Sequence, residues 1–141
     1  MTLNIYSDPA FLPLVRSVTE KMCELLGFDE VAVGMIVLSV DEALTNIIKH
    51  AYHGCADKKI DIEISAKDNN CNALKISMRD YGQYVDPANI KSRDLADVRP
   101  GGLGVHIISK CMDSMNFSPA PGGGTLLTLV KKIPQQQGSK Q

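Results

Sequence analysis

The chain has 141 residues, a mass of 15.3 kDa and a formal net charge of −1. This length suits one domain with a hydrophobic core, and a composition of 44% hydrophobic and 22% charged residues is ordinary for a soluble globular protein. The balanced charge and the absence of Trp argue against a nucleic-acid partner, which needs a basic face or stacking platforms. The apolar run from Met35 to Val40 is too short for a bilayer, and the N-terminus lacks the basic start of a signal peptide, so we expect no membrane partner.

Cysteine usage points to a reducing compartment. The chain has four cysteines: Cys23, Cys55, Cys71 and Cys111. All are more than ten residues apart, so no CxxC pair exists, and we expect free thiols in a cytoplasmic protein. His50, His53 and Cys55 are the nearest approach to a metal-ligand cluster, but they lack the fourth ligand that such sites need.

The N-terminal part predicts a strand and then a helix. Residues 2–7 alternate apolar and polar side chains, which indicates a short strand. Asp8 followed by Pro9 resembles an N-cap with proline in the first turn. From residue 10 to 26 apolar side chains recur at helical spacing, and Gly27 is a natural C-terminal stop.

A second, amphipathic helix is predicted from Asp29 to about Tyr52, where His53 and Gly54 end it. One arc of this helix is apolar and predicts the core face: Ile36, Val40, Ala43, Leu44, Ile47 and Ala51. The opposite arc is polar: Ser39, Glu42, Asn46, Lys49, His50 and His53. The simplest interpretation of that polar arc is a solvated surface.

The rest of the chain predicts a sheet interrupted by an irregular segment. The alternating residues 60–68 and 73–80 indicate a β-hairpin, and only a short helix near 87–91 is plausible between residues 81 and 102. A helix from Val105 to Met112 and two strands follow, and residues 134–141 predict a disordered tail. The order of elements predicts an α+β fold, a two-layer α/β sandwich in which a mostly antiparallel mixed sheet carries helices on one face.

The second helix also carries candidate chemistry. Glu42 and Asn46 are i,i+4 neighbours, so both side chains can reach one ligand. Carboxylate and amide oxygens suit Mg²⁺, and a carboxylate one turn from such a metal can act as a general base.

Two further segments offer ligand contacts. Asp80 ends a predicted strand, where it can accept a hydrogen bond from an exocyclic amine, and Gly82 allows a planar ligand to approach the backbone. The glycines at 101, 102 and 104 precede the helix predicted at Val105, where free N–H groups favour phosphate. Ordinary turns and a flexible loop remain the alternatives for these segments and for the glycines at 122–124, and neither a P-loop nor a Rossmann fingerprint is present.

Four stretches together resemble the ATPase domain shared by gyrase, histidine kinases and mismatch-repair ATPases, the GHKL or Bergerat fold. They are DEALTNIIKHAY, RDYGQYVDP, RPGGLG and GGGTLLTL. The forms NIIKHAY and GGLGVHIISKCMD narrow the resemblance to the anti-sigma-factor serine kinases of the RsbW and SpoIIAB type. It covers roughly residues 3–133 and implies an ATP-binding kinase domain at 1–133.

The resemblance implies roles for individual residues. Glu42 would be the general base, Asn46 would hold Mg²⁺, and Asp80 would bind the adenine amine, with Gly82 under the ring and Thr125 supporting the base through water. Residues 86–101 would form a lid over ATP, in which Lys91, Arg93 and Arg99 are alternatives to Lys49 for neutralising phosphate charge. The full set implied to contact ATP is Asn46, Lys49, His50, Asp80, Gly82, Arg99, Gly101, Gly102, Leu103, Gly104, Val105 and Thr125.

The implied activity is that of an ATP- and Mg²⁺-dependent protein serine/threonine kinase. Its substrate would be a small antagonist of the STAS type, and its unphosphorylated partners would decide whether it sequesters a sigma factor or another regulator. Two alternatives stay open: a non-catalytic ATP-binding interaction module and a standalone ATPase. Homologous domains often dimerise, which makes the first strand and helix a candidate surface for a homodimer.

Overall fold

The computed structural model describes residues 1–68, 71–83 and 100–135. Its sheet has the order β1-β2-β3-β5-β4, and every neighbouring pair is antiparallel. The strands are β1 (Thr2–Tyr6), β2 (Lys59–Asp68), β3 (Cys71–Asp80), β4 (Ser114–Pro119) and β5 (Thr125–Lys132). The helices are η1 (Pro9–Phe11), α1 (Leu12–Leu25), α2 (Glu30–Asn46), the π-helical η2 (Ile47–Ala51) and α4 (Pro100–Cys111).

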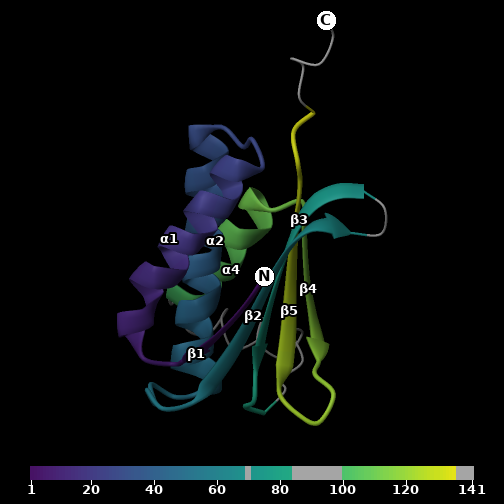
Figure 1. The fold of residues 1–141 in the computed structure, drawn as a ribbon. Coiled ribbons are helices and arrows are strands. Elements are labelled where there is room, and N and C mark those ends of the chain that lie inside the picture. Colours follow the sequence, from purple (N-terminus) through teal and green to yellow (C-terminus); the bar gives the residue numbers. More distant parts are fainter. Residues whose placement is uncertain (69–70, 84–99, 136–141) are drawn as a thin grey trace, which may run out of the picture.

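Among the described residues, the helices α1, α2 and α4 cover one face of the sheet (Figure 1). Alternate residues of the central strands point into the layer between helices and sheet, where Ile60, Ile62, Ile76 and Leu129 are fully buried. The other face carries mostly polar side chains, such as those of Asp61, Glu63 and Ser77, together with Leu126 and Val130 of β5. The α+β two-layer prediction is confirmed, and the pairings of the described strands are antiparallel throughout rather than mixed.

Local signals placed the start and end of the first helical segment correctly. The carboxylate of Asp8 accepts a hydrogen bond from the N–H of Ala10 at 2.9 Å, which caps η1 ahead of α1. At the other end, Gly27 adopts a left-handed φ of 87°, a conformation that glycine takes without steric cost.

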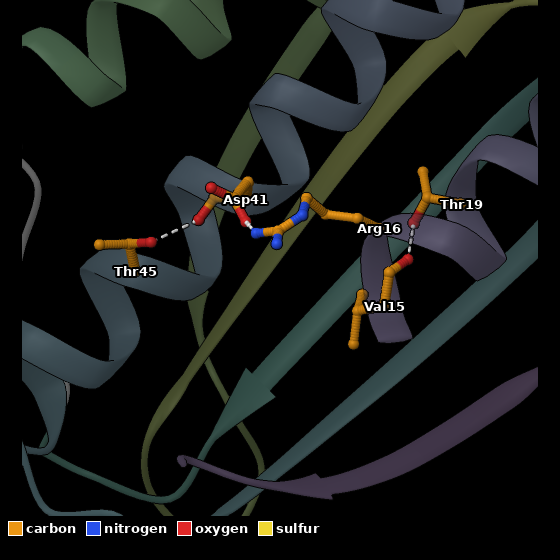
Figure 2. A network of polar contacts seen from close by, with 5 residues as sticks. All are labelled: Val15, Arg16, Thr19, Asp41 and Thr45. Atoms are coloured by element: carbon orange, nitrogen blue, oxygen red, sulfur yellow. Dashed lines mark hydrogen bonds and ion pairs between the residues drawn. The ribbon is translucent and has the colours of Figure 1, made fainter. Parts of the chain in front are cut away.

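A polar network joins α1 to α2 (Figure 2). The guanidinium of Arg16 lies 2.7 Å from the carboxylate of Asp41, and both side chains are partly exposed. Two hydroxyls in the same view, those of Thr19 and Thr45, donate back to carbonyls one turn earlier in their own helices. The ion pair therefore ties the two helices together at their exposed edge.

The apolar arc of α2 is buried against the sheet, as predicted, although Ala51 is only half-buried. The prediction for Ser39 is wrong, because this residue is fully buried and its hydroxyl donates to the carbonyl of Met35 at 2.9 Å. A small hydroxyl satisfied within its own helix can be buried at little cost. By length and composition the continuous helix Glu30–Ala51 could cross a membrane, but here it is the central helix of the core.

The helix predicted to begin near Val105 begins five residues earlier, at Pro100. Proline is favoured in the first helical turn, because its missing N–H would have no partner there and its φ suits the helix. The glycine cluster is therefore the first turn of α4 rather than a loop before it. The β-hairpin and the last two strands are confirmed, while the short helix predicted at 87–91 and the tail beyond residue 135 lie outside the described residues.

Candidate functional site: the end of β3 around Asp80

Four segments far apart in the sequence reach the same end of the molecule. The C-terminal end of the α2–η2 helix, the end of β3, the start of β5 and the N-terminal end of α4 all lie at the end of the sheet opposite the β2–β3 turn (Figure 1). Contacts join three of them: β3 pairs with β5, and Gly82 packs on η2 so closely that a Cβ on it would lie 3.0 Å from the carbonyl oxygen of Ala51. The four motifs singled out in the sequence therefore lie at one end of the molecule, and three of them are in contact.

Asp80 lies at the centre of this arrangement. It is the last residue of β3 and only 4% exposed. Its Oδ1 accepts hydrogen bonds from the N–H of Gly82 at 2.9 Å and from the N–H of Thr125 at 3.3 Å. Burial raises the pKa of Asp80, and these two hydrogen bonds together with the charge of Arg79 oppose the rise. A buried carboxylate with one oxygen fixed by the backbone is preorganised to accept a further hydrogen bond from a ligand.

The glycine turn before β5 is shaped by its contact with Asp80. Gly124 has a φ of 89°, and a Cβ on it would lie 2.0 Å from the main-chain oxygen of Asp80, so no larger residue fits without a shift of the backbone. Arg79 holds the same turn from the other side, since its guanidinium donates to the carbonyl of Pro121 at 2.6 Å and stacks 4.4 Å from the centre of the Tyr81 ring. The glycine turn is therefore packed directly against the end of β3.

Tyr52 is a site residue that the sequence analysis did not single out. Its side chain is 6% exposed, and its hydroxyl donates to the carbonyl of Lys59 at 2.5 Å and accepts from the N–H of Tyr81 at 2.6 Å. It follows directly on the π-helical turn, which ends with the N–H of Tyr52 bonded to the carbonyl of Ile47. This hydroxyl fixes the backbone beside Asp80 to the end of the second helix. The signal available was an apolar stretch that ends in a tyrosine, whose hydroxyl needs partners once it is buried.

The remaining predicted residues are arranged along the same helix and around α4. Glu42 and Asn46 are half-buried in the last turns of α2, and Lys49 and His50 are exposed in η2. Residues 101–105 lie in the first turns of α4, which begins at Pro100. The first N–H groups of a helix have no partner within it and are open to a ligand. Thr125 reaches Asp80 through its backbone N–H. Arg99, Lys91 and Arg93 lie outside the described residues.

A bound Mg²⁺ would suit this donor set only with help from a ligand. In the part of the chain that the structure describes, no three His, Cys, Asp or Glu side chains come together as a metal cage. Asn46 offers a half-buried amide oxygen at the end of α2. Mg²⁺ characteristically takes one or two protein oxygens and completes its octahedron with phosphate and water, so the residues present fit a metal that arrives with a nucleotide.

The chain belongs to the family described as the histidine kinase-like ATPase domain, which matches residues 5–131. The match contains the polar end of α2, the end of β3, all of α4 and most of β5. The GHKL resemblance drawn from the four sequence motifs is therefore confirmed.

Relatives with two different names match this chain, one a serine-protein kinase and the other an anti-sigma factor. The serine-protein kinase RsbW of Listeria monocytogenes is 25% identical over 134 residues, which cover 91% of this chain and 85% of that protein. The anti-sigma F factor of Oceanobacillus iheyensis is 32% identical over 98 residues, which cover 67% of this chain and 65% of that protein.

Solved structures support the fold. The structure of the RsbU and RsbW domains of Rv1364c from Mycobacterium tuberculosis superposes with a TM-score of 0.62 at 15% identity, covering 96% of this chain and 33% of that one. The histidine kinase domain from the Erythrobacter litoralis EL346 blue-light activated histidine kinase gives a TM-score of 0.55 at 20% identity, covering 88% and 60%.

Proposed function

We propose that this chain is an ATP- and Mg²⁺-dependent protein serine/threonine kinase of the anti-sigma-factor type. It phosphorylates a small antagonist protein of the STAS type and, when that antagonist is phosphorylated, sequesters a sigma factor or a similar regulator in the cytoplasm. The observation that carries the proposal is the buried carboxylate of Asp80, fixed through Oδ1 where the polar end of α2, the glycine turn and the N-terminus of α4 converge. The relatives named serine-protein kinase and anti-sigma factor support it.

In this proposal different residues bind the base, bind the phosphates and transfer the proton. Asp80 accepts a hydrogen bond from the amino group of adenine, and Gly82 leaves room for the ring. The first-turn N–H groups of α4 hold the phosphates. Glu42 takes the proton from the attacking seryl hydroxyl, whose oxygen bonds to the γ-phosphorus while ADP leaves with the electrons of the broken P–O bond. A Mg²⁺ held by Asn46 would neutralise charge on the phosphates.

The test is phosphotransfer from labelled ATP to a purified STAS-type antagonist in the presence of Mg²⁺. We expect labelled antagonist with the wild-type chain, and a loss of roughly 100-fold or more for Glu42→Gln, the scale on which general-base catalysis operates. Nucleotide affinity should stay within a small factor, because Glu42 is assigned to the reaction and not to binding. Glu63→Gln, on an exposed residue of β2, is the matched control and should behave like wild type.

Other outcomes of that assay select the alternatives. ATP binding without any phosphoprotein indicates a non-catalytic module, and release of phosphate without an acceptor indicates a standalone ATPase. Full phosphotransfer by Glu42→Gln overturns the assignment of the base while leaving the kinase proposal intact.

We also propose that the chain forms a homodimer through β1 and α1. Tyr6 and Leu14, one on each element, are both 55% exposed, so each element offers a large apolar side chain to a second copy. Leu14→Glu should shift the protein to a monomer in sedimentation analysis. A monomer in the wild type would refute this part of the proposal.

A further inference from the structure

A groove between α1 and α2 lies away from the nucleotide site, beside the turn that joins the two helices. Its volume is about 530 Å³. It is lined by Glu20, Glu24, Phe28, Glu30, Val33, Gly34 and Val37. Figure 1 places this turn at the opposite end of α2 from the end of β3. From Gly34 to Ala51 the helix rises roughly 25 Å, so the groove and the contacts of Gly82 on η2 are separate places on the molecule.

The floor of the groove is apolar and its rim is acidic. Phe28 and Val33 are each 8% exposed and form a floor that belongs to the core. Glu20, Glu24 and Glu30 supply three carboxylates, of which Glu24 is paired with the ammonium of Lys21 at 3.3 Å. Within the described residues Glu20 and Glu30 form no ion pair. An occupant that complements this surface carries apolar side chains and positive charge.

Gly34 is an independent sign that something packs there. It lies in the interior of α2, where glycine is less stable than alanine. A Cβ on Gly34 would meet no atom within 4 Å, so no contact among the described residues requires glycine at this position. A missing side chain allows the backbone of another segment to approach a helix closely. On either side along α2, Val31 and Leu38 are 73% and 43% exposed, which extends the groove into an uncovered apolar stripe.

We propose that this groove binds a cationic, amphipathic helical segment of the regulator that the chain sequesters. The inference rests on the proposed function, because a transcription regulator that binds DNA presents Lys and Arg to phosphates. The groove offers carboxylates to the same cations over an apolar floor that accepts the uncharged face of the segment. Binding here covers the basic surface of the regulator and leaves the nucleotide site free.

The first experiment uses the full chain and a defined probe. The probe is a fluorescent peptide of about 15 residues that forms an amphipathic helix with a leucine face flanked by lysines. Fluorescence anisotropy should show saturable binding that weakens as salt rises from about 0.05 to 0.5 M, because added ions screen exposed charges. The charge-reversed peptide, with Glu in place of each Lys, should not bind. Equal binding of the two peptides overturns the proposal.

Variants then locate the binding. Gly34→Gln should abolish most of the peptide binding by filling the groove, and Glu20→Gln with Glu30→Gln should weaken it by roughly fivefold, on the scale of exposed ion pairs. Gly34→Ala should raise the Tm by about 3 °C, which establishes that the backbone there needs no glycine to fold. Glu63→Gln on β2 is the control and should bind the peptide like wild type.

The outcomes separate this inference from the proposed function. Groove variants should retain phosphotransfer to the antagonist, because the groove lies at the far end of α2 from Asp80. Wild-type binding by Gly34→Gln overturns the groove even if the chain proves to be a kinase, whereas a chain without phosphotransfer that still binds the peptide through Gly34 refutes only the kinase. Self-association that Gly34→Gln abolishes would make a second copy the occupant and would also overturn the proposal.

Discussion

Replacing Asp80 by Asn separates nucleotide binding from folding, because one oxygen is kept and the other is changed. The substituted amide retains a carbonyl oxygen that can accept from the N–H groups of Gly82 and Thr125 at the 2.9 and 3.3 Å seen for Asp80. The second oxygen becomes an NH₂ group, so in the proposed complex a donor would face the amino group of adenine. A hydrogen bond to a charged partner contributes about 1.5–3 kcal/mol, so the affinity for ATP should fall roughly 10- to 150-fold.

The same substitution should leave the nucleotide-free protein at least as stable near neutral pH. Burial raises the pKa of Asp80, so the folded state binds this proton more tightly than the unfolded chain. The stability contributed by that proton is fully present below the unfolded pKa and is lost as pH rises through the folded pKa. Above that window the buried carboxylate costs stability that an uncharged amide does not cost.

Calorimetric titration with a non-hydrolysable ATP analogue measures the affinity, and thermal unfolding between about pH 4 and pH 8 measures the stability. The Tm difference between Asp80→Asn and wild type should grow in favour of the variant as pH rises. Asp57→Asn, on an exposed residue of the connection before β2, is the control and should change neither quantity. Unchanged ATP affinity in Asp80→Asn, or a loss of affinity that follows a loss of stability, would refute the reasoning.

Three further experiments test contacts at the site and between the first two helices. Gly124→Ala should lower the unfolding free energy by about 1–3 kcal/mol more than Gly123→Ala, since both residues have a left-handed φ but only the former would place a Cβ 2.0 Å from a backbone oxygen; equal losses in urea titrations would contradict the clash. Tyr52→Phe should cost about 1–3 kcal/mol, because it leaves a backbone N–H without its partner, and unchanged stability would mean that water replaces the hydroxyl. A double-mutant cycle on Arg16 and Asp41 should give a coupling below about 1 kcal/mol, because both side chains are partly exposed; a larger value would indicate a desolvated pair.

Sequence reasoning was most accurate where a structure depends on near neighbours. The cap at Asp8, the stop at Gly27 and the buried arc of α2 follow from residues within one or two helical turns. It was less accurate where such signals compete. The glycines after Pro100 suggested a loop, yet the helix already begins at that proline.

For the candidate site, too, the sequence indicated some features and not others. Glu42, Asn46 and Asp80 could be identified from the sequence as candidate ligand-binding residues. The first two are a carboxylate and an amide at helical i,i+4 spacing, and the third is a carboxylate at the end of a predicted strand. The supporting contacts were not visible. Tyr52 and Tyr81 are 29 residues apart, and Asp80 and Thr125 are 45 apart, so their hydrogen bonds exist only after the sheet has assembled.

From the sequence by itself came the element order, the amphipathic helix and the four motifs, since periodicity and residue type are properties of short stretches. The tertiary structure decided that β5 pairs with β3, that Gly124 lies against the backbone of Asp80, and that an acidic groove opens beside Gly34. These features depend on how distant segments pack, and packing is fixed by the whole core at once, because each buried side chain touches neighbours from several elements.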